Sequence, residues 1–373
     1  MKVMTILGTR PEIIRLSLVI PLLDRYTEHL LVHTGQNYDD RLNELFFREM
    51  GVRTPDVLMG IRGKHFGEQV GQMLARAEDL FMEHRPDRLL ILGDTNSGLC
   101  AIVAARLGIP VFHMEAGNRC YDDRVPEEVN RRTIDHASTV LMPYTERSRA
   151  NLLREGIASD RIYVTGNPIK QVLDHYAARI DGSTALDTLK LKPRGYVLVT
   201  MHRAENVDVE PRLRSLLAAL AHVRAQTGKP VICSLHPRTR SRMQALEPGI
   251  AGDVVFLEPL GLFDFVRLEK DAFCILSDSG TVQEEACIFG IPNVTIREVT
   301  ERPETVECGS NLIAGSDPDA IGAAVALATK EPCGWRVPEE YHRPQVAEAV
   351  VRIVTSFRLP TPAEVQWQAG RQL

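Results

Sequence analysis

A repeated alternation of short apolar runs with longer amphipathic segments constrains the fold most strongly. The first run, residues 2–7, ends at Gly8, and an amphipathic stretch over residues 11–23 follows it, which predicts a strand, a tight loop and a helix. Such alternation is typical of parallel sheets, and near-continuous apolar strands indicate that helices cover both sheet faces. The sequence therefore predicts an α/β fold built on doubly wound parallel sheets.

The alternation runs through the chain twice, and 373 residues suit two domains better than one core. Further strands are predicted over residues 29–32, 88–92, 111–113 and 162–164, before the breaker cluster TGNP at residues 165–168. A second set is predicted over residues 196–200, 231–234, 254–256, 274–276 and 293–296. We therefore expect one domain over residues 1–167, another over 168–355, and a tail over 356–373.

Composition excludes several classes of function. The net charge of −5 provides no broad positive field for a nucleic-acid backbone or an anionic membrane surface, so we expect neither partner. Residues 1–9 lack the apolar core of a signal peptide, and no run approaches the roughly 18 apolar residues of a membrane span. The seven cysteines are scattered and never in C-x-x-C spacing, which is typical of reduced thiols and predicts no metal site. We expect a cytoplasmic protein.

Polar residues directly follow several predicted strands, where parallel sheets bind ligands. In the segment GTRPE at residues 8–12, Arg10 and the backbone amides could hold a diphosphate, although a surface helix start with a solvated arginine fits equally. Neither G-x-G-x-x-G nor a Walker A sequence is present, so the usual signatures of dinucleotide hydride carriers and P-loop nucleotidases are missing.

The second half has its own candidates. Ser279 and Gly280 open a predicted helix whose first amides can receive an anion, and Glu285 lies where it could accept ribose hydroxyls, though complementarity to the helix dipole also explains a carboxylate there. His202 and His236 end two strands and could donate to phosphate or relay protons, although lone histidines are usually structural. Arg302 belongs to a mixed-charge loop that is ordinarily a solvated surface, but it could reach a ligand.

Three acids in the first half, Asp94, Glu115 and Glu127, lie close to Gly or Pro at presumed strand ends or loops. Each alone fits a cap or a surface charge. Clustered carboxylates repel and raise one another's pKa, so folds tolerate them mostly where protons are moved. We interpret the three as candidate proton carriers.

Several segments, taken in order, resemble the non-hydrolysing UDP-N-acetylglucosamine 2-epimerases. They are GTRPE at 8–12, GDT at 93–95, HMEAG at 113–117, VPEEVNR at 125–131, DSG at 278–280 with QEE at 283–285, and TERPE at 300–304. The resemblance covers residues 1 to at least 309. It implies a GT-B-like fold of two Rossmann-like domains with an interdomain cleft for a UDP-sugar, a homodimer, and a C-terminal helix that crosses back to the first domain.

The resemblance also implies residue roles. Proton chemistry would belong to Asp94, Glu115 and Glu127, with His202 as a further catalytic candidate. The UDP-sugar would be held by Arg10, His202, His236, Phe265, Ser279, Gly280, Glu285 and Arg302, with Phe265 near uracil. No cofactor is needed, because UDP can be eliminated as the C2 proton is removed and added back to a 2-acetamidoglycal.

Two departures narrow the resemblance. Arg15 stands where the UDP-GlcNAc enzymes commonly carry Lys, and GQNYD at 35–39 replaces a segment linked to activator binding, so activation by substrate is not expected. HTGQNYD at 33–39 and EAGNRC at 115–120 look more like the branch that makes UDP-N-acetyl-L-fucosamine from its talose-configured epimer. Three other functions stay open: a GT-B glycosyltransferase, a hydrolysing 2-epimerase and a catalytically silent UDP-sugar sensor.

Overall fold

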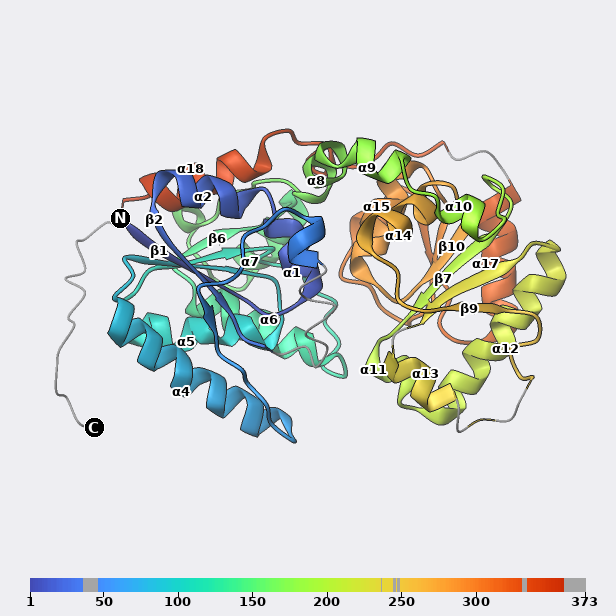
Figure 1. Ribbon diagram of the computed structural model, residues 1–373, viewed down its shortest axis with the longest axis horizontal. Helices are drawn as coiled ribbons and strands as arrows, with labels where there is room; N and C mark the ends of the chain where they lie inside the picture. The colour runs from blue at the N-terminus through green and yellow to red at the C-terminus, as the bar shows by residue number, and fades with distance from the viewer. Residues whose placement is uncertain (36–45, 236, 244–245, 247–248, 331–333, 359–373) are drawn as a thin grey trace. The chain divides into compact units, whose positions relative to one another are not determined.

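The computed structural model describes residues 1–35, 46–235, 237–243, 246, 249–330 and 334–358 (Figure 1). Within them the chain forms two compact units, residues 1–172 with 343–358 and residues 173–342. Each unit contains one six-stranded parallel sheet flanked by helices, which confirms the predicted fold class. In this described part of the chain, no helix is both long and apolar enough to cross a membrane.

The first unit has the strand order β3-β2-β1-β4-β5-β6, the order of a Rossmann sheet. Its strands are β1 (Lys2–Leu7), β2 (Glu28–His33), β3 (Val57–Leu58), β4 (Arg88–Leu92), β5 (Val111–Met114) and β6 (Val140–Met142). Its helices are α1 (Arg10–Leu16), α2 (Val19–Tyr26), α4 (Phe66–His84), α5 (Cys100–Arg106), α6 (Pro126–Ala137) and α7 (Glu146–Arg154), and α8 (Ile169–His175) carries the chain out of the unit.

Two local predictions in this unit were wrong. The helix predicted over residues 11–23 is two helices, because Pro21 lacks an N–H and its ring would clash with the carbonyl of Ser17 in a continuous helix. The strand predicted over residues 162–164 is only an isolated bridge from Ile162 to Leu141 of β6. The three residues of β6 form the sheet edge, and so short a run carries no clear period in the sequence.

The second unit has the strand order β12-β11-β10-β7-β8-β9, which is the same order as in the first unit when it is read from the β9 edge. Its strands are β7 (Val197–Met201), β8 (Val231–Leu235), β9 (Val255–Leu257), β10 (Cys274–Ser277), β11 (Asn293–Thr295) and β12 (Asn311–Ile313). Its helices are α9 (Ala177–Asp181), α10 (Ala185–Thr188), α11 (Ala204–Val207), α12 (Glu210–Thr227), α13 (Pro237–Met243), α14 (Leu262–Lys270), α15 (Gly280–Phe289), α16 (Pro303–Glu307) and α17 (Pro318–Lys330).

The central strands of this sheet are buried on both faces. Val197, Val199 and Met201 of β7 pack into one apolar cluster, whereas Tyr196 and Leu198 pack into another. Successive side chains of a strand point to opposite faces, so an unbroken apolar run fits a strand covered on both sides. This is the physical origin of the apolar runs that the sequence displays.

The last helix, α18 (Val346–Ser356), belongs to the first unit, where it packs beside α2 (Figure 1). Its buried face includes Val346, Val350 and Val354. Arg88 at the start of β4 donates to the carbonyl of Phe357 at 2.7 Å and stacks over Phe112. The sequence placed the domain boundaries at residues 167 and 355, whereas the contacts divide the chain after Val172 and return it to the first unit at Arg343.

Candidate active site

The carboxyl ends of β4 and β5 bring two of the three predicted acids to one edge of the first sheet. The two strands are neighbours, and the Gly93 N–H donates to the Met114 carbonyl at 3.0 Å, so Asp94 and Glu115 leave the sheet side by side. A Cβ at Gly93 would lie 3.9 Å from a Glu115 carboxylate oxygen. Glu115 has a φ of +65°, a left-handed conformation that is costly for a non-glycine residue and recurs at functional sites.

Glu115 is almost completely buried, with 9% of its surface exposed. Its carboxylate forms an ion pair with Arg15 of α1 and accepts bonds from the Tyr144 hydroxyl at 3.3 Å and the Asn118 amide at 3.2 Å. The ion pair joins α1 to the end of β5. In the sequence Arg15 was only a departure from the family, and its pairing with Glu115 was not predicted.

Asp94 is held by helix α6. Arg131 contacts the Asp94 carboxylate through Nε at 2.8 Å and Nη2 at 2.6 Å, and Asn130 donates to the Asp94 carbonyl at 3.0 Å. Residues three and four apart share a helix face, so Glu127, in the first turn of α6, lies on the face that carries Asn130 and Arg131. Glu127 therefore lies on the same face of α6 as the two residues that hold Asp94.

Glu128 fixes the loop that precedes α6. This fully buried carboxylate accepts from the Cys120 N–H at 3.1 Å, the Tyr121 N–H at 3.0 Å and Arg131 Nη1 at 2.8 Å. Arg131 thus bridges Glu128 to Asp94. The sequence motif contained both Glu127 and Glu128. Nothing in the local pattern showed that Glu128 is the one that holds the loop.

A second buried network supports the loop after β5. Asp135 of α6 contacts His113 Nδ1 at 2.8 Å and Arg119 at 2.8 Å, and it accepts the Gly117 N–H at 3.1 Å. Burial by itself would raise the pKa of Asp135, but the hydrogen bonds and charges of His113 and Arg119 lower it below its usual value. An ionised Asp135 therefore anchors the loop that carries Glu115.

The loop after β1 lies beside these acids, because β1 is the neighbour of β4. Arg10 begins α1, and its guanidinium lies over the Phe46 ring, 5.5 Å from the ring centre. Glu12 turns back toward the loop and accepts from the Gly8 N–H at 3.1 Å and the Thr9 hydroxyl at 2.7 Å. Burial raises the pKa of Glu12 to about 7. Glu12 thus holds the loop that presents Arg10.

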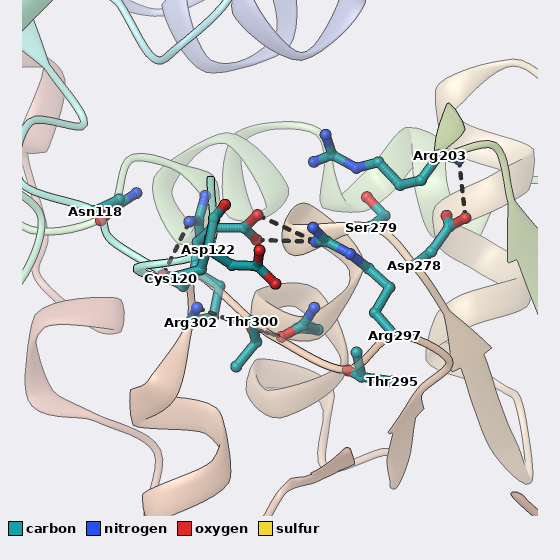
Figure 2. A network of polar contacts seen from close by, with 12 residues as sticks. Asn118, Cys120, Asp122, Arg203, Asp278, Ser279, Thr295, Arg297, Thr300 and Arg302 are labelled. Carbon is teal, nitrogen blue, oxygen red and sulfur yellow. Dashed lines mark hydrogen bonds and ion pairs between the residues drawn. The ribbon is translucent and has the colours of Figure 1, made fainter. Parts of the chain in front are cut away.

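In the second unit, Asp278 joins the carboxyl ends of β7 and β10. It is fully buried and accepts the backbone N–H groups of His202 and Arg203, each at 2.9 Å, and the Asn206 amide at 3.0 Å. Figure 2 shows the contact between Arg203 and Asp278. His202 Nδ1 lies 3.1 Å from the same carboxylate, while the His202 side chain stays exposed. Burial alone would raise the pKa of Asp278, but its charged and hydrogen-bonded partners lower it. The sequence pattern did not predict this orienting role.

The start of α15 gathers three predicted ligand residues. Ser279 precedes the first residue of the helix, Gly280, and the Arg302 guanidinium packs on Gly280, where a Cβ would lie 3.5 Å from Arg302 Cζ. Arg302 also forms an ion pair with Glu284 of the same helix. The nearby Thr300 (Figure 2) donates to Gln283 at 2.6 Å. A cation and helix-start amides therefore lie together, as an anion site requires.

Glu285 and Phe265 lie at the interface of α14 and α15. Glu285 is 5% exposed, and Phe265 packs against a cluster that contains Val282 and Ala286 of α15. His236 and residues 36–39 lie outside the described residues. Within the described part of the chain, no group of three or more His, Cys, Asp or Glu side chains could hold a metal ion.

Known proteins are similar to this chain over most of its length. A family model described as UDP-N-acetylglucosamine 2-epimerase matches residues 23–355. The chain is 38% identical over 364 residues to the UDP-N-acetylglucosamine 2-epimerase of Methanocaldococcus jannaschii, covering 95% of this chain and 99% of that protein. It is 37% identical over 326 residues to the UDP-2,3-diacetamido-2,3-dideoxy-D-glucuronate 2-epimerase of Pseudomonas aeruginosa, covering 86% and 90% of the two chains.

Solved structures agree with the sequence relatives. The M. jannaschii UDP-GlcNAc 2-epimerase in complex with UDP-GlcNAc and UDP superposes with a TM-score of 0.89 at 37% identity, covering 95% of this chain and 99% of that one. A glycosyltransferase of lipopolysaccharide biosynthesis superposes with a TM-score of 0.60 at 14% identity, covering 95% and 100%, which shows a shared GT-B-like fold alone. From its sequence, its two Rossmann sheets and these relatives, the chain belongs to the UDP-N-acetylglucosamine 2-epimerase family.

Proposed function

We propose that this protein inverts carbon 2 of a UDP-N-acetylhexosamine without net hydrolysis. The observation that carries the proposal is the placement of Asp94 and Glu115 at adjacent strand ends, with Glu127 on the helix that holds Asp94, in a chain of this family. Carboxylates at one sheet edge suit a reaction that moves a proton on and off carbon. A sugar-binding protein without chemistry would not need three of them.

Elimination and re-addition fit these residues. The C2 proton is not acidified by a neighbouring carbonyl, so a carboxylate removes it as UDP leaves C1, which gives a 2-acetamidoglycal. UDP then adds back while a second group delivers a proton to the opposite face. Arg15 and Arg131 pair with the carboxylates of Glu115 and Asp94 and hold them at the strand ends, so these two suit the acceptance of a proton. Glu127 suits a proton carrier for the other face.

The second unit supplies the groups suited to UDP. The α15 amides, Arg302 and the His202 ring oriented by Asp278 stabilise the departing diphosphate. Glu285 accepts the ribose hydroxyls, and Phe265 lies against uracil. Arg10 of the first unit and His236 are further UDP-sugar contacts, as the family resemblance implies. None of these roles requires a cofactor.

Replacement of each acid tests the proposal. We expect Asp94→Asn, Glu115→Gln and Glu127→Gln each to lower turnover by about 100-fold or more, while affinity for UDP largely survives. Glu83→Gln is the control, since Glu83 is an exposed acid near the end of α4. Turnover is followed by NMR and UDP binding by calorimetry, on variants whose melting temperatures show that they are folded. Unchanged turnover in all three variants would refute the assignment.

Isotope exchange separates this function from its rivals. In deuterated water an epimerase incorporates deuterium at C2 of the UDP-sugar pool. A GT-B glycosyltransferase instead transfers the sugar to an added acceptor without exchange, and a hydrolysing 2-epimerase accumulates stoichiometric UDP and free N-acetylmannosamine. A silent sensor binds UDP-sugar with neither exchange nor product.

The proposal also concerns which hexosamine is the substrate and which oligomer the chain forms. The relatives act by name on UDP-N-acetylglucosamine or a diacetamido uronate, whereas residues 33–39 and 115–120 look like the UDP-N-acetyl-L-fucosamine branch. NMR of products from UDP-GlcNAc, UDP-ManNAc and the 6-deoxy-L-hexosamine analogues distinguishes them. We further propose a cytoplasmic homodimer, which cell fractionation and sedimentation velocity can each refute.

A further inference from the structure

Glu269 is a buried carboxyl in an otherwise apolar helix contact. It lies in α14, which packs on α15 through Leu268, Val282 and Ala286. Glu269 has no exposed surface, and among the described residues no N–H or O–H group donates to either of its side-chain oxygens. An ionised carboxylate in such a place would cost far more than a neutral carboxylic acid. The reaction described above does not use this group.

The polar group that faces Glu269 is another carboxyl, that of Glu285. Glu269 follows Phe265 by four residues on α14, and Glu285 lies between Val282 and Ala286 on the facing side of α15, so both point into the same interface. A side-chain hydrogen bond joins Glu269 to Glu285, and such a bond requires one of the two carboxyl groups to keep a proton, because two carboxylates can only accept. Burial first, and then the charge of Glu285, raise the pKa of Glu269 well above its usual value.

We propose that Glu269 is a positioning residue for the nucleotide site, which as a neutral acid donates its proton in a hydrogen bond to Glu285 and orients that carboxylate toward the nucleoside ribose. The inference rests on the proposed function, in which Glu285 accepts ribose hydroxyls. An arginine in this place would offset the charge of Glu285, whereas a neutral acid fixes the orientation and preserves the charge. A carboxylate has about four lone-pair sites, so one bond from Glu269 leaves capacity for hydroxyl donors.

Two substitutions at position 269 separate positioning from packing. Glu269→Met keeps the side-chain length but removes the donor, and Glu269→Gln keeps a donor in its N–H₂ group. We expect the Met variant to be at least as stable to urea as the parent protein, because a buried polar group has been removed. We expect it to bind UDP about tenfold more weakly and to raise KM, with kcat changed less than about twofold.

The ribose itself provides the specific readout. Affinities for UDP and 2′-deoxy-UDP are measured by calorimetry; the parent protein should prefer UDP, the Met variant should lose most of that preference, and the Gln variant should stay within about threefold of the parent. Lys270→Gln is the matched control, since Lys270 is the next residue of α14 and forms an exposed ion pair with Asp181. If the Met variant does not fold, Glu269→Leu takes its place, and the Gln variant still tests the need for a donor.

The outcomes are distinguishable. The Glu285→Gln variant is measured first, and its loss of the preference for UDP over 2′-deoxy-UDP is the reference for the position-269 variants. If that variant keeps the preference, the ribose role assigned to Glu285 in the proposed function fails. If it loses the preference while Glu269→Met binds both nucleotides like the parent, only the positioning role fails. A folded Gln variant that binds as weakly as the Met variant would also overturn the role, because donation would then be irrelevant.

Discussion

At the scale of single residues, two buried arginines of the first unit pair with the acids of the candidate site. Arg15 faces Glu115, and Arg131 faces both Asp94 and Glu128. Removing one partner of such a pair strands an uncompensated charge, which is far more destabilising than the pair itself is stabilising. The arginines therefore matter as much as the acids for holding the candidate proton carriers in place.

Glu12 is a buried acid with hydroxyl and amide partners, and it should make stability depend on pH. Its pKa is raised from 4.5 to about 7 by burial. The folded state thus holds the proton over a range in which the unfolded chain has lost it, so stability falls as pH rises through this window and is constant above it. The loss amounts to about 3 kcal/mol, since one pKa unit is worth about 1.4 kcal/mol.

Glu12→Gln should remove this dependence. Gln can accept from the Gly8 and Thr9 groups and donate to the Thr95 hydroxyl, 3.3 Å from Glu12 Oε1, so it reproduces the pattern of the protonated acid. In urea denaturation, the stability of the variant relative to the parent should rise between about pH 5 and about pH 7 and level off beyond. A relative stability that does not change with pH would contradict the raised pKa.

At the scale of elements, successive residues of α15 contact different neighbouring segments. Consecutive residues of a helix point in different directions, so Gln283 contacts Thr300, Glu284 contacts Arg302, and Glu285 faces Glu269. The amides at the start of the same helix point along its axis toward the proposed diphosphate. One helix therefore links the proposed anion-binding loop, the carboxylate that we propose binds the ribose, and the cation that packs on Gly280.

A thiol pair reports on how α15 packs against α16. Cys287 Sγ of α15 lies 3.7 Å from Cys308 Sγ, which directly follows α16, and the hydrogen bond from Cys287 lowers the pKa of Cys308. We expect diamide to oxidise the pair to a disulfide: the two thiols lose two hydrogens, and diamide is reduced to the hydrazine. Mass spectrometry of unreduced peptides should detect the cross-link in most of the protein.

Diamide can reach the pair through Cys308, which is partly exposed and lies beside Cys287. Cys274 of β10 is fully buried and should stay reduced, so it provides an internal control for this oxidation. Cys308→Ser should abolish the cross-link. If Cys287 and Cys308 both stay available to an alkylating reagent after diamide treatment, the packing of the two helices differs from that described.

At the scale of the whole molecule, each unit has its own apolar core, but the first is assembled from the two ends of the chain. Residues 1–172 form the sheet, and residues 343–358 return to cover it with α18. Burying Val346, Val350 and Val354 stabilises the fold only because α18 packs against α2 and the start of β4. The breaker cluster at residues 165–168 is a local signal and says nothing about this return of the chain.

Val350→Asp should therefore weaken the first unit selectively. Val350 has no exposed surface, and a buried unpaired carboxyl there should cost about 3 kcal/mol or more. Hydrogen exchange followed by mass spectrometry should show lost protection in α2 and α18 and little change in β7 and β10. Arg352→Asp, on the exposed face of the same helix, should leave exchange unchanged. Equal loss of protection in both units would contradict their independence.

The sequence by itself determined the parallel sheets and the edge at which polar residues gather. Apolar runs that end at glycines are local signals, and strand direction then places every carboxyl end at one edge, so the sequence alone is enough to expect Asp94 and Glu115 at the same edge. The break between α1 and α2 at residues 17–18, which Pro21 causes, was equally local in origin, but the apolar period across residues 11–23 concealed it.

Only the tertiary structure decided which charges meet. Arg15 and Glu115 are a hundred residues apart, and Glu269 and Glu285 lie on different helices. No period or turn signal encodes such pairs. They follow from strand order and helix packing, which are set by many small burial energies summed over the whole fold rather than by any one segment.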